Sequence, residues 1–195
     1  MIQFFGILSV LLALFNRGAY LYSILKGETK PHAFSWITWS IVSTIACLAQ
    51  WTEGAGAGAW ARTLSTLFSY LFIVFAFTRG EKNITRGDWA TLIVTLCAIP
   101  LWYFTKTPVW SVILVTTIDV IGYYPTIRKS LTKPQEESWP SWLLSGLSSL
   151  ASLFAMENIN LSTSLYTFVM VVTNLGFTLF LFIRRRQIQL ISRIL

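Results

Sequence analysis

The chain has 195 residues, of which 54% are hydrophobic and only 12% are charged. A soluble domain carries about 25% charged residues, so this composition excludes an ordinary soluble protein and indicates an integral membrane protein. The formal net charge of +7 could suggest a nucleic-acid-binding protein, but the placement of the basic residues along the chain is explained better by membrane topology.

Seven segments are long and apolar enough, or nearly so, to cross a membrane as helices, which takes about 20 mostly apolar residues. In chain order they are residues 2–25, 34–51, 60–78, 88–105, 108–127, 139–156 and 162–183. The first segment lacks the basic start and the cleavage site of a signal peptide, so we interpret it as a retained helix. Polar or glycine-rich stretches separate the segments, and Asp88 is placed to cap the fourth helix.

One stretch of the sequence occurs twice. Residues 20–39 read YLYSILKGETKPHAFSWITW and residues 123–142 read YYPTIRKSLTKPQEESWPSW. The two align without a gap at an offset of 103, and nine of the twenty positions are identical. Proline and tryptophan are among the matches, and these rare residues seldom coincide by chance, so we predict a duplicated unit of about half the chain.

The basic residues predict the orientation of the chain in the membrane. Twelve of the fifteen lysines and arginines follow the first, third, fifth or seventh segment. The loops on the opposite side hold only Lys106, and Arg17 and Arg62 fall inside segments. Because cytoplasmic loops carry the excess of basic residues, we expect the N-terminus outside and the C-terminus in the cytoplasm.

Both copies of the repeat follow an odd-numbered segment, so the two halves share one orientation, and one further helix has to reverse the chain between them. We therefore predict an all-α integral membrane protein with seven transmembrane helices in a 3+1+3 arrangement of parallel repeats. The predicted units are 1–86 for the first repeat, 87–107 for the linker helix, 108–187 for the second repeat and 188–195 for a cytoplasmic tail. The short loops and the retained first helix point to a prokaryotic inner membrane.

A three-helix repeat with the basic loop YPTIRKS at 124–130, followed by ESW at 137–139, resembles the PQ-loop repeat. The whole arrangement is similar to the SWEET and PQ-loop transporter superfamily, although Thr126 stands where the family has glutamine. The resemblance implies hinge prolines in both halves, and here only the second half has them, as Pro125 and Pro140. It also implies a substrate-binding asparagine at mid-depth on the third helix of a half, which falls on Asn174 in the second half and on Leu71 in the first.

Ionisable side chains at mid-membrane are costly, so Asp119, near the middle of the fifth segment, is the first functional candidate. The repeat places Asn16 at the matching position, and Tyr20 and Tyr123 lie four residues further on, on the same helix faces. Three roles for Asp119 remain open: proton coupling or substrate contact, an ion pair with Arg17, or a hydrogen bond between helices. Arg17 could instead extend to the cytoplasmic interface.

Trp39 and Trp142 lie one turn deeper than the tryptophans at the interface, with Ser43 and Gly146 one turn further along. A tryptophan ring beside a small residue that leaves room suits a sugar or a heteroaromatic ligand, whereas a belt of tryptophans at the interface is the structural alternative. Two further patterns have structural interpretations. Arg62 lies near the outer interface, where we expect its side chain to extend to the surface. A stripe of small residues is typical of close helix packing, and the sixth segment carries one, formed by Ser145, Ser149 and Ser152.

The expected function is a carrier of a small polar solute (a sugar, an amino acid or a vitamin-like molecule) that works by alternating access, either facilitated or coupled to protons. The alternative is a receptor of the same fold that binds without translocation. We expect no enzyme and no cofactor, because the sequence shows no nucleophile–base pair, carboxylate pair or phosphate-binding glycine loop. We expect no metal site, because His32 is the single histidine and Cys47 and Cys97 have no ligand-like neighbours. The expected partners are the solute, the lipid bilayer and, in the coupled case, protons, with a homo-oligomer left open and no nucleic acid.

Overall fold

The computed structural model describes residues 1–105 and 108–194, so Lys106 and the predicted end of the linker at 107 lie outside it. The described chain is helical, and its α-helices are α1 (Ile2–Leu25), α2 (Ala33–Thr52), α3 (Trp60–Arg79), α4 (Arg86–Thr105), α5 (Pro108–Thr132), α6 (Trp139–Phe154) and α7 (Leu161–Ile194). Two short 3-10 helices, η1 (Gly56–Ala59) and η2 (Pro134–Glu136), precede α3 and α6. No β-strand occurs in the part of the chain that is described.

The helix boundaries agree with the predicted segments to within two residues, except at the ends of two helices. Helix α5 continues to Thr132 and α7 continues to Ile194. Neither extension contains glycine or proline, so nothing in it stops a helix that hydrophobicity alone would end at the interface. The predicted boundary at 187 therefore lies inside a continuous helix.

Five of these helical segments are long and apolar enough to cross a membrane: α1, α2, η1 with α3, α5 and α7. Helix α6 has 16 residues, so it is about 24 Å long and shorter than the hydrocarbon core of a bilayer. Large apolar side chains face outward from several helices, among them Phe15, Leu67 and Phe168, each more than half exposed. Such surfaces would aggregate in water, so the chain is membrane-embedded.

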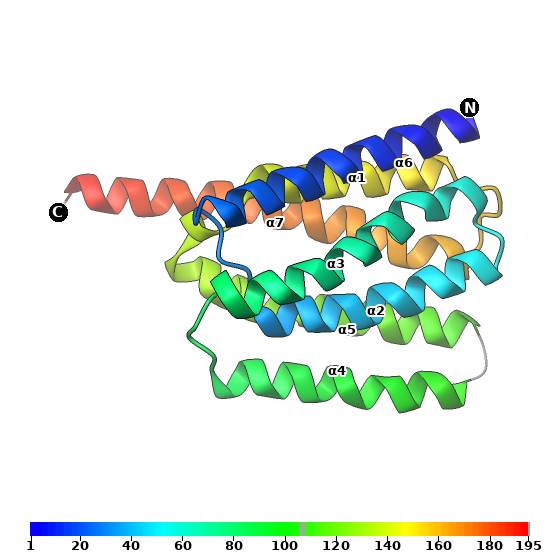
Figure 1. Cartoon of the computed structure of the whole chain (residues 1–195), viewed down its shortest axis with the longest axis horizontal. Coiled ribbons are helices and arrows are strands. Elements are labelled where there is room, and N and C mark those ends of the chain that lie inside the picture. Colours follow the sequence, from blue (N-terminus) through cyan, green and yellow to red (C-terminus); the bar gives the residue numbers. More distant parts are fainter. Residues whose placement is uncertain (106–107, 195) are drawn as a thin grey trace.

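The helix pairings follow the internal repeat. Helix α3 packs against α1 and α2, and α7 packs in the same way against α5 and α6. The repeat relates α1 to α5 and α2 to α6. Helix α1 packs against α6 and α2 packs against α5, so each of these two contacts is the repeat equivalent of the other. Helix α4 lies at the edge of the bundle against α5 and α2 (Figure 1).

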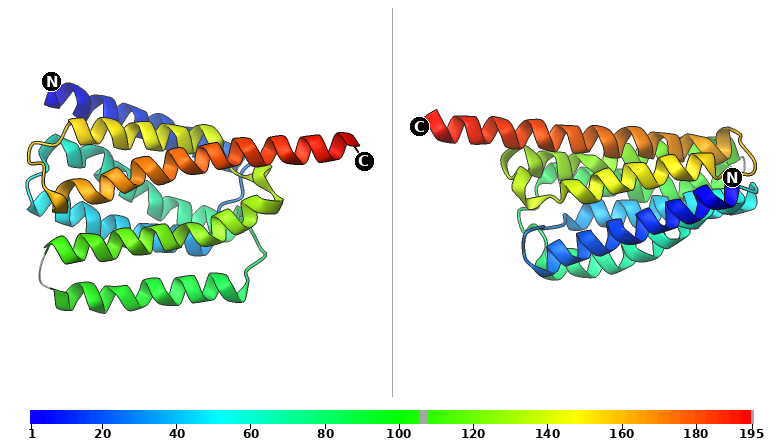
Figure 2. Two further views of the ribbon diagram at one scale, coloured as in Figure 1. Left: turned by 180° about the vertical axis from the view of Figure 1, so that it is seen from behind. Right: turned by 90° about the horizontal axis from the view of Figure 1, so that it is seen from above.

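The two ends of the bundle differ in charge. The loops 26–32, 80–85 and 133–138 lie together at the end from which the C-terminal part of α7 projects, whereas the N-terminus lies at the other end (Figure 2). We call the end with these three loops the basic end. The loops and the nearby helix ends carry eleven of the twelve basic residues that the sequence placed on one side. The twelfth is Arg193, in the projecting part of α7.

Candidate functional site

A cavity of about 70 Å³ lies inside the bundle. Its lining comes from α1, α2, η1, α3, α5, α6 and α7. Eight of the predicted site residues line it: Asn16, Arg17, Trp39, Ser43, Asp119, Tyr123, Trp142 and Asn174. The duplicated sequence thus brings its candidate residues to one place, between the two sets of helices.

Asp119 is buried, with 2% of its surface exposed. Its Oδ1 accepts a hydrogen bond from the hydroxyl of Tyr166 at 2.7 Å, and its Oδ2 is buried without a hydrogen-bond partner among the described residues. Of the roles left open by the sequence, the described contacts show the bond between helices and no ion pair with Arg17. The free Oδ2 still leaves Asp119 able to bind a solute or a proton. Sequence analysis missed Tyr166, whose repeat partner is Thr63, so the repeat gave no indication of it.

Arg17 and Arg62, the two arginines within the predicted apolar segments, both line the cavity. The guanidinium carbon of Arg17 lies 5.9 Å from the ring centroids of Trp36 and of Phe72, and that of Arg62 lies 4.4 Å from the ring of Tyr166. The Nε atoms of both are buried without a hydrogen-bond partner in the described chain. Arg62 therefore points inward, contrary to our expectation that it extends to the outer interface, because an aromatic ring of α7 offers its side chain a place to stack.

Aromatic rings form the wall of the cavity that faces the basic end. Trp39 and Trp142 contact each other with ring centroids 5.5 Å apart, and Trp36 lies 5.3 Å from Trp39. Tyr20 does not line the cavity. It lies behind this wall, where its hydroxyl accepts a hydrogen bond from Nε1 of Trp36 at 3.3 Å. Trp39 and Trp142 are buried in the bundle at 8% exposure each, which fits a wall and not an interfacial belt.

Small polar side chains line the rest of the cavity. The stripe of Ser145, Ser149 and Ser152 on α6 belongs to this lining, although we interpreted it as a packing surface. Close packing occurs instead at Gly146, where a Cβ atom would meet Cδ2 of Leu175 at 2.5 Å, so Gly146 leaves room for a neighbouring helix and not for a ligand. The small residues of α6 therefore have two uses: the three serines line the cavity, and Gly146 allows close packing against α7.

Asn174 and the two prolines occupy simpler positions. Asn174 is buried, and its Nδ2 donates to the carbonyl of Met170 at 2.6 Å, one turn earlier in α7. Pro125 lies inside α5, where it removes one main-chain hydrogen bond, whereas Pro140 lies in the first turn of α6, where none is lost. Of the two predicted hinges, only Pro125 interrupts the bonding within a helix.

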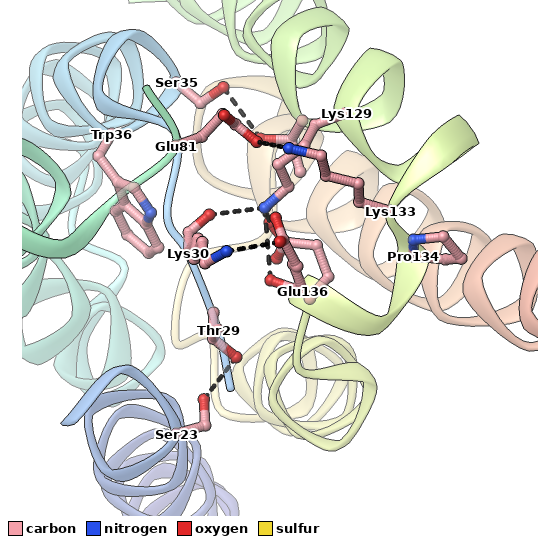
Figure 3. Close-up of polar contacts among 12 residues, drawn as sticks. Ser23, Thr29, Lys30, Ser35, Trp36, Glu81, Lys129, Lys133, Pro134 and Glu136 are labelled. Carbon is pink, nitrogen blue, oxygen red and sulfur yellow. Dashed lines mark hydrogen bonds and ion pairs between the residues drawn. The ribbon is translucent and has the colours of Figure 1, made fainter. Parts of the chain in front are cut away.

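At the basic end, lysine–glutamate pairs join loops of the two repeats (Figure 3). Lys30 Nζ lies 2.7 Å from Oε1 of Glu136, and Lys133 Nζ lies 3.2 Å from Oε2 of Glu81. The main-chain N–H of Lys30 also donates to the carbonyl of Glu136 at 3.1 Å. Lys129 is buried between them, paired with Glu137 and bonded to the carbonyl of Lys30 at 2.6 Å. We call these contacts the basic-end latch, and they join the loops of the two repeats at this end of the bundle.

The hydrogen bond to Glu136, with its charge, raises the pKa of Lys30. Burial raises the pKa of Glu81, but the hydrogen bonds from the main-chain amide of Asn83 and from Lys133 outweigh it, so the net change is a lowered pKa. Both pKa shifts favour the charged forms of Lys30 and Glu81.

We expect His32 to make the stability of the protein depend on pH. Burial lowers the pKa of His32 below its ordinary value of 6.5, and Lys129 and Arg128 act in the same direction, while Asp88, 3.4 Å from Nε2, opposes them. The unfolded chain therefore binds this proton more tightly than the folded protein does. We expect stability from His32 to be fully present above the unfolded value and to be lost as the pH falls through about 6.5 and below.

Purified wild-type protein should thus melt at a lower temperature at about pH 5.5 than at about pH 7.5. The variant His32→Gln, which carries no titrating group, should show a smaller difference between the two pH values. Equal differences in the two proteins, measured by thermal unfolding in one detergent, would show that His32 does not contribute.

No cluster of three or more histidine, cysteine or acidic residues that could hold a metal occurs in the described chain. Comparison with protein-family models, with curated proteins and with solved structures found no match.

Proposed function

We propose that this chain is a membrane carrier of the SWEET and PQ-loop type, which moves a small polar solute through the cavity by alternating access. In this proposal all seven helices span the membrane in a 3+1+3 order, with the basic end in the cytoplasm of a prokaryotic cell. The matching helix pairings of the two repeats support the order. The excess of basic residues at one end supports the orientation.

One observation carries the proposal: the cavity is lined by both members of two repeat pairs, Asn16 with Asp119 and Trp39 with Trp142. In carriers built from repeats the solute site lies between the repeats, where motion of one half against the other exposes it to either side. Protein interiors are otherwise close-packed, so polar side chains around an internal space indicate a site for a ligand. Asp119, with one unpartnered oxygen, is the residue we propose for proton coupling.

The basic-end latch supports a moving closure. In the pair of Lys30 and Glu136 both side chains are partly exposed, at 44% and 21%, and an exposed ion pair contributes only about 0–1 kcal/mol. This pair can break and re-form at little cost when the two halves rock. The buried Lys129 stays paired with Glu137 within its own repeat and gives up only its bond to the carbonyl of Lys30. The latch therefore suits a gate at one end of a solute pathway.

Alternating access can be tested without knowing the solute. A single cysteine at Ser149, in a variant whose Cys47 and Cys97 are replaced by alanine, reports on the cavity. We expect it to react with a membrane-impermeant maleimide from either face of oriented vesicles. Cysteines at Asn158 and at Arg186, at opposite ends of the bundle, should each react from one face only and so verify the orientation.

Reaction at Ser149→Cys from one face only would favour the alternative, a receptor that binds without translocation. Absence of reaction from both faces, with both orientation controls labelled, would contradict the carrier proposal, because a solute pathway has to admit water.

A further inference from the structure

The charge of the cavity narrows the class of solute. Among the described residues that line the cavity, the basic and acidic side chains are those of Arg17, Arg62 and Asp119. An arginine stays protonated at every physiological pH. The cavity therefore carries an excess of at least one positive charge, whether Asp119 is ionised or not.

Neither arginine of the cavity forms an ion pair with a described residue of the protein. No ion pair of Arg17 or Arg62 occurs within the described residues, and the Nε atom of each is buried without a hydrogen-bond partner. The rings of Trp36, Phe72 and Tyr166 hold the guanidinium groups in place. These contacts leave N–H donors unused, because a ring face attracts the cation without accepting several hydrogen bonds. An anion in the cavity would supply the missing acceptors and the missing charge.

The aromatic wall presents an apolar surface to such an anion. The three indole N–H groups already have acceptors inside the protein: Trp36 donates to Tyr20, Trp39 to the carbonyl of Asp119 and Trp142 to Glu137. Since their polar atoms are occupied, what remains for a solute is ring surface, which favours a flat, apolar molecular body.

We propose that the cavity binds a small carboxylate with a flat apolar body, its carboxylate toward Arg17 and Arg62 and its body against the tryptophans. This inference rests on the proposed function and narrows its solute class. The planar guanidinium group matches a carboxylate through paired N–H donors. A single negative charge suits the cavity when Asp119 is ionised, so a monoanion fits better than a dianionic phosphate.

Three probes of nearly the same shape test the charge preference: benzoate, benzamide and benzamidine, which are anionic, neutral and cationic at neutral pH. Binding to the full-length protein in detergent is measured by titration calorimetry and by tryptophan fluorescence, with inorganic phosphate as a fourth probe. We expect benzoate to bind about tenfold or more tightly than benzamide, and benzamidine and phosphate to bind most weakly.

Arg17→Gln and Arg62→Gln should each reduce the preference for benzoate over benzamide. Arg186→Gln, which removes the same charge from an exposed position outside the cavity, should leave the preference unchanged. If a cavity variant fails to fold, the comparison of benzoate, benzamide and benzamidine on the unmodified protein still tests whether the cavity prefers an anion.

Equal binding of benzoate and benzamide, tighter binding of benzamidine or phosphate, or no binding of any probe would each overturn the carboxylate proposal. A preference that survives in both cavity variants would overturn it as well. The maleimide experiment uses no solute, so failure here and failure of the carrier proposal give different results.

Discussion

Replacement of Lys129 by methionine should lower the free energy of unfolding by about 3–5 kcal/mol, as expected when one partner of a buried ion pair is removed. Lys129 and its partner Glu137 are both almost fully buried. Methionine keeps much of the volume of the lysine side chain but removes the cation that is paired with the carboxylate of Glu137. One hydrogen bond would remain to that carboxylate, from Nε1 of Trp142 at 3.2 Å. Denaturant or thermal unfolding in a fixed detergent measures the change.

The repeat supplies a matched control. Lys26 occupies the position equivalent to Lys129, but it is exposed, and its Nζ lies over the ring of Tyr22 at 4.6 Å. We expect Lys26→Met to leave the stability unchanged within error. The double variant Lys129→Met, Glu137→Gln should be more stable than Lys129→Met alone, because it removes the uncompensated charge. Equal losses in the Lys26 and Lys129 variants would show that burial does not distinguish the two sites.

This difference between the copies shows what a repeat predicts and what it does not. The alignment places Lys26 opposite Lys129, but it also places Phe34 opposite Glu137, so only the second copy has an acidic partner. A positive residue near a helix end predicts topology whether its side chain is exposed or buried. Which of the two occurs depends on whether the following loop supplies an acidic partner. Only the second copy does so, and the matching positions of an alignment do not reveal it.

The helices were predictable, because the length of an apolar segment can be read from that segment alone. The central pair of Asn16 and Asp119 was predictable, because the repeat aligns two polar residues within apolar segments. The direction of Arg62 and the contact between Tyr166 and Asp119 were not, because they depend on how α3, α5 and α7 are rotated against one another. The position of a residue within an apolar segment indicates its depth in the bilayer. It is a weak guide to whether the side chain points into the bundle or toward the lipid. For the same reason small residues on α6 divide between packing, as at Gly146, and cavity lining.

A covalent lock on the basic-end latch should abolish entry into the cavity from that end. Cysteines in place of Lys30 and Glu136, in the variant without Cys47 and Cys97, would be joined to each other as a disulfide by a mild oxidising reagent, which leaves the single cysteine at Ser149 without a partner thiol and therefore free. The native pair meets at 2.7 Å, and the main chains are bonded to each other, so the two positions are within reach. We expect the cysteine at Ser149 to become unreactive from the basic side, to stay reactive from the other side, and to recover after reduction.

The cross-link distinguishes two roles of the latch, a gate that opens and a contact that only stabilises the bundle, because the two roles predict different accessibility of the cavity. If the latch only holds the bundle together, the joined protein differs from the unjoined one in stability but not in the side from which Ser149→Cys is reached. If it is a gate, accessibility changes on one side while the helices around the cavity stay as they are. A control pair at Lys26 and Glu28, both in the first-repeat loop, can be treated with the same reagent without linking the halves. Loss of reactivity in that control would assign the effect to the reagent, whereas loss confined to the Lys30 and Glu136 pair requires that the two repeats move apart at the basic end for a solute to pass.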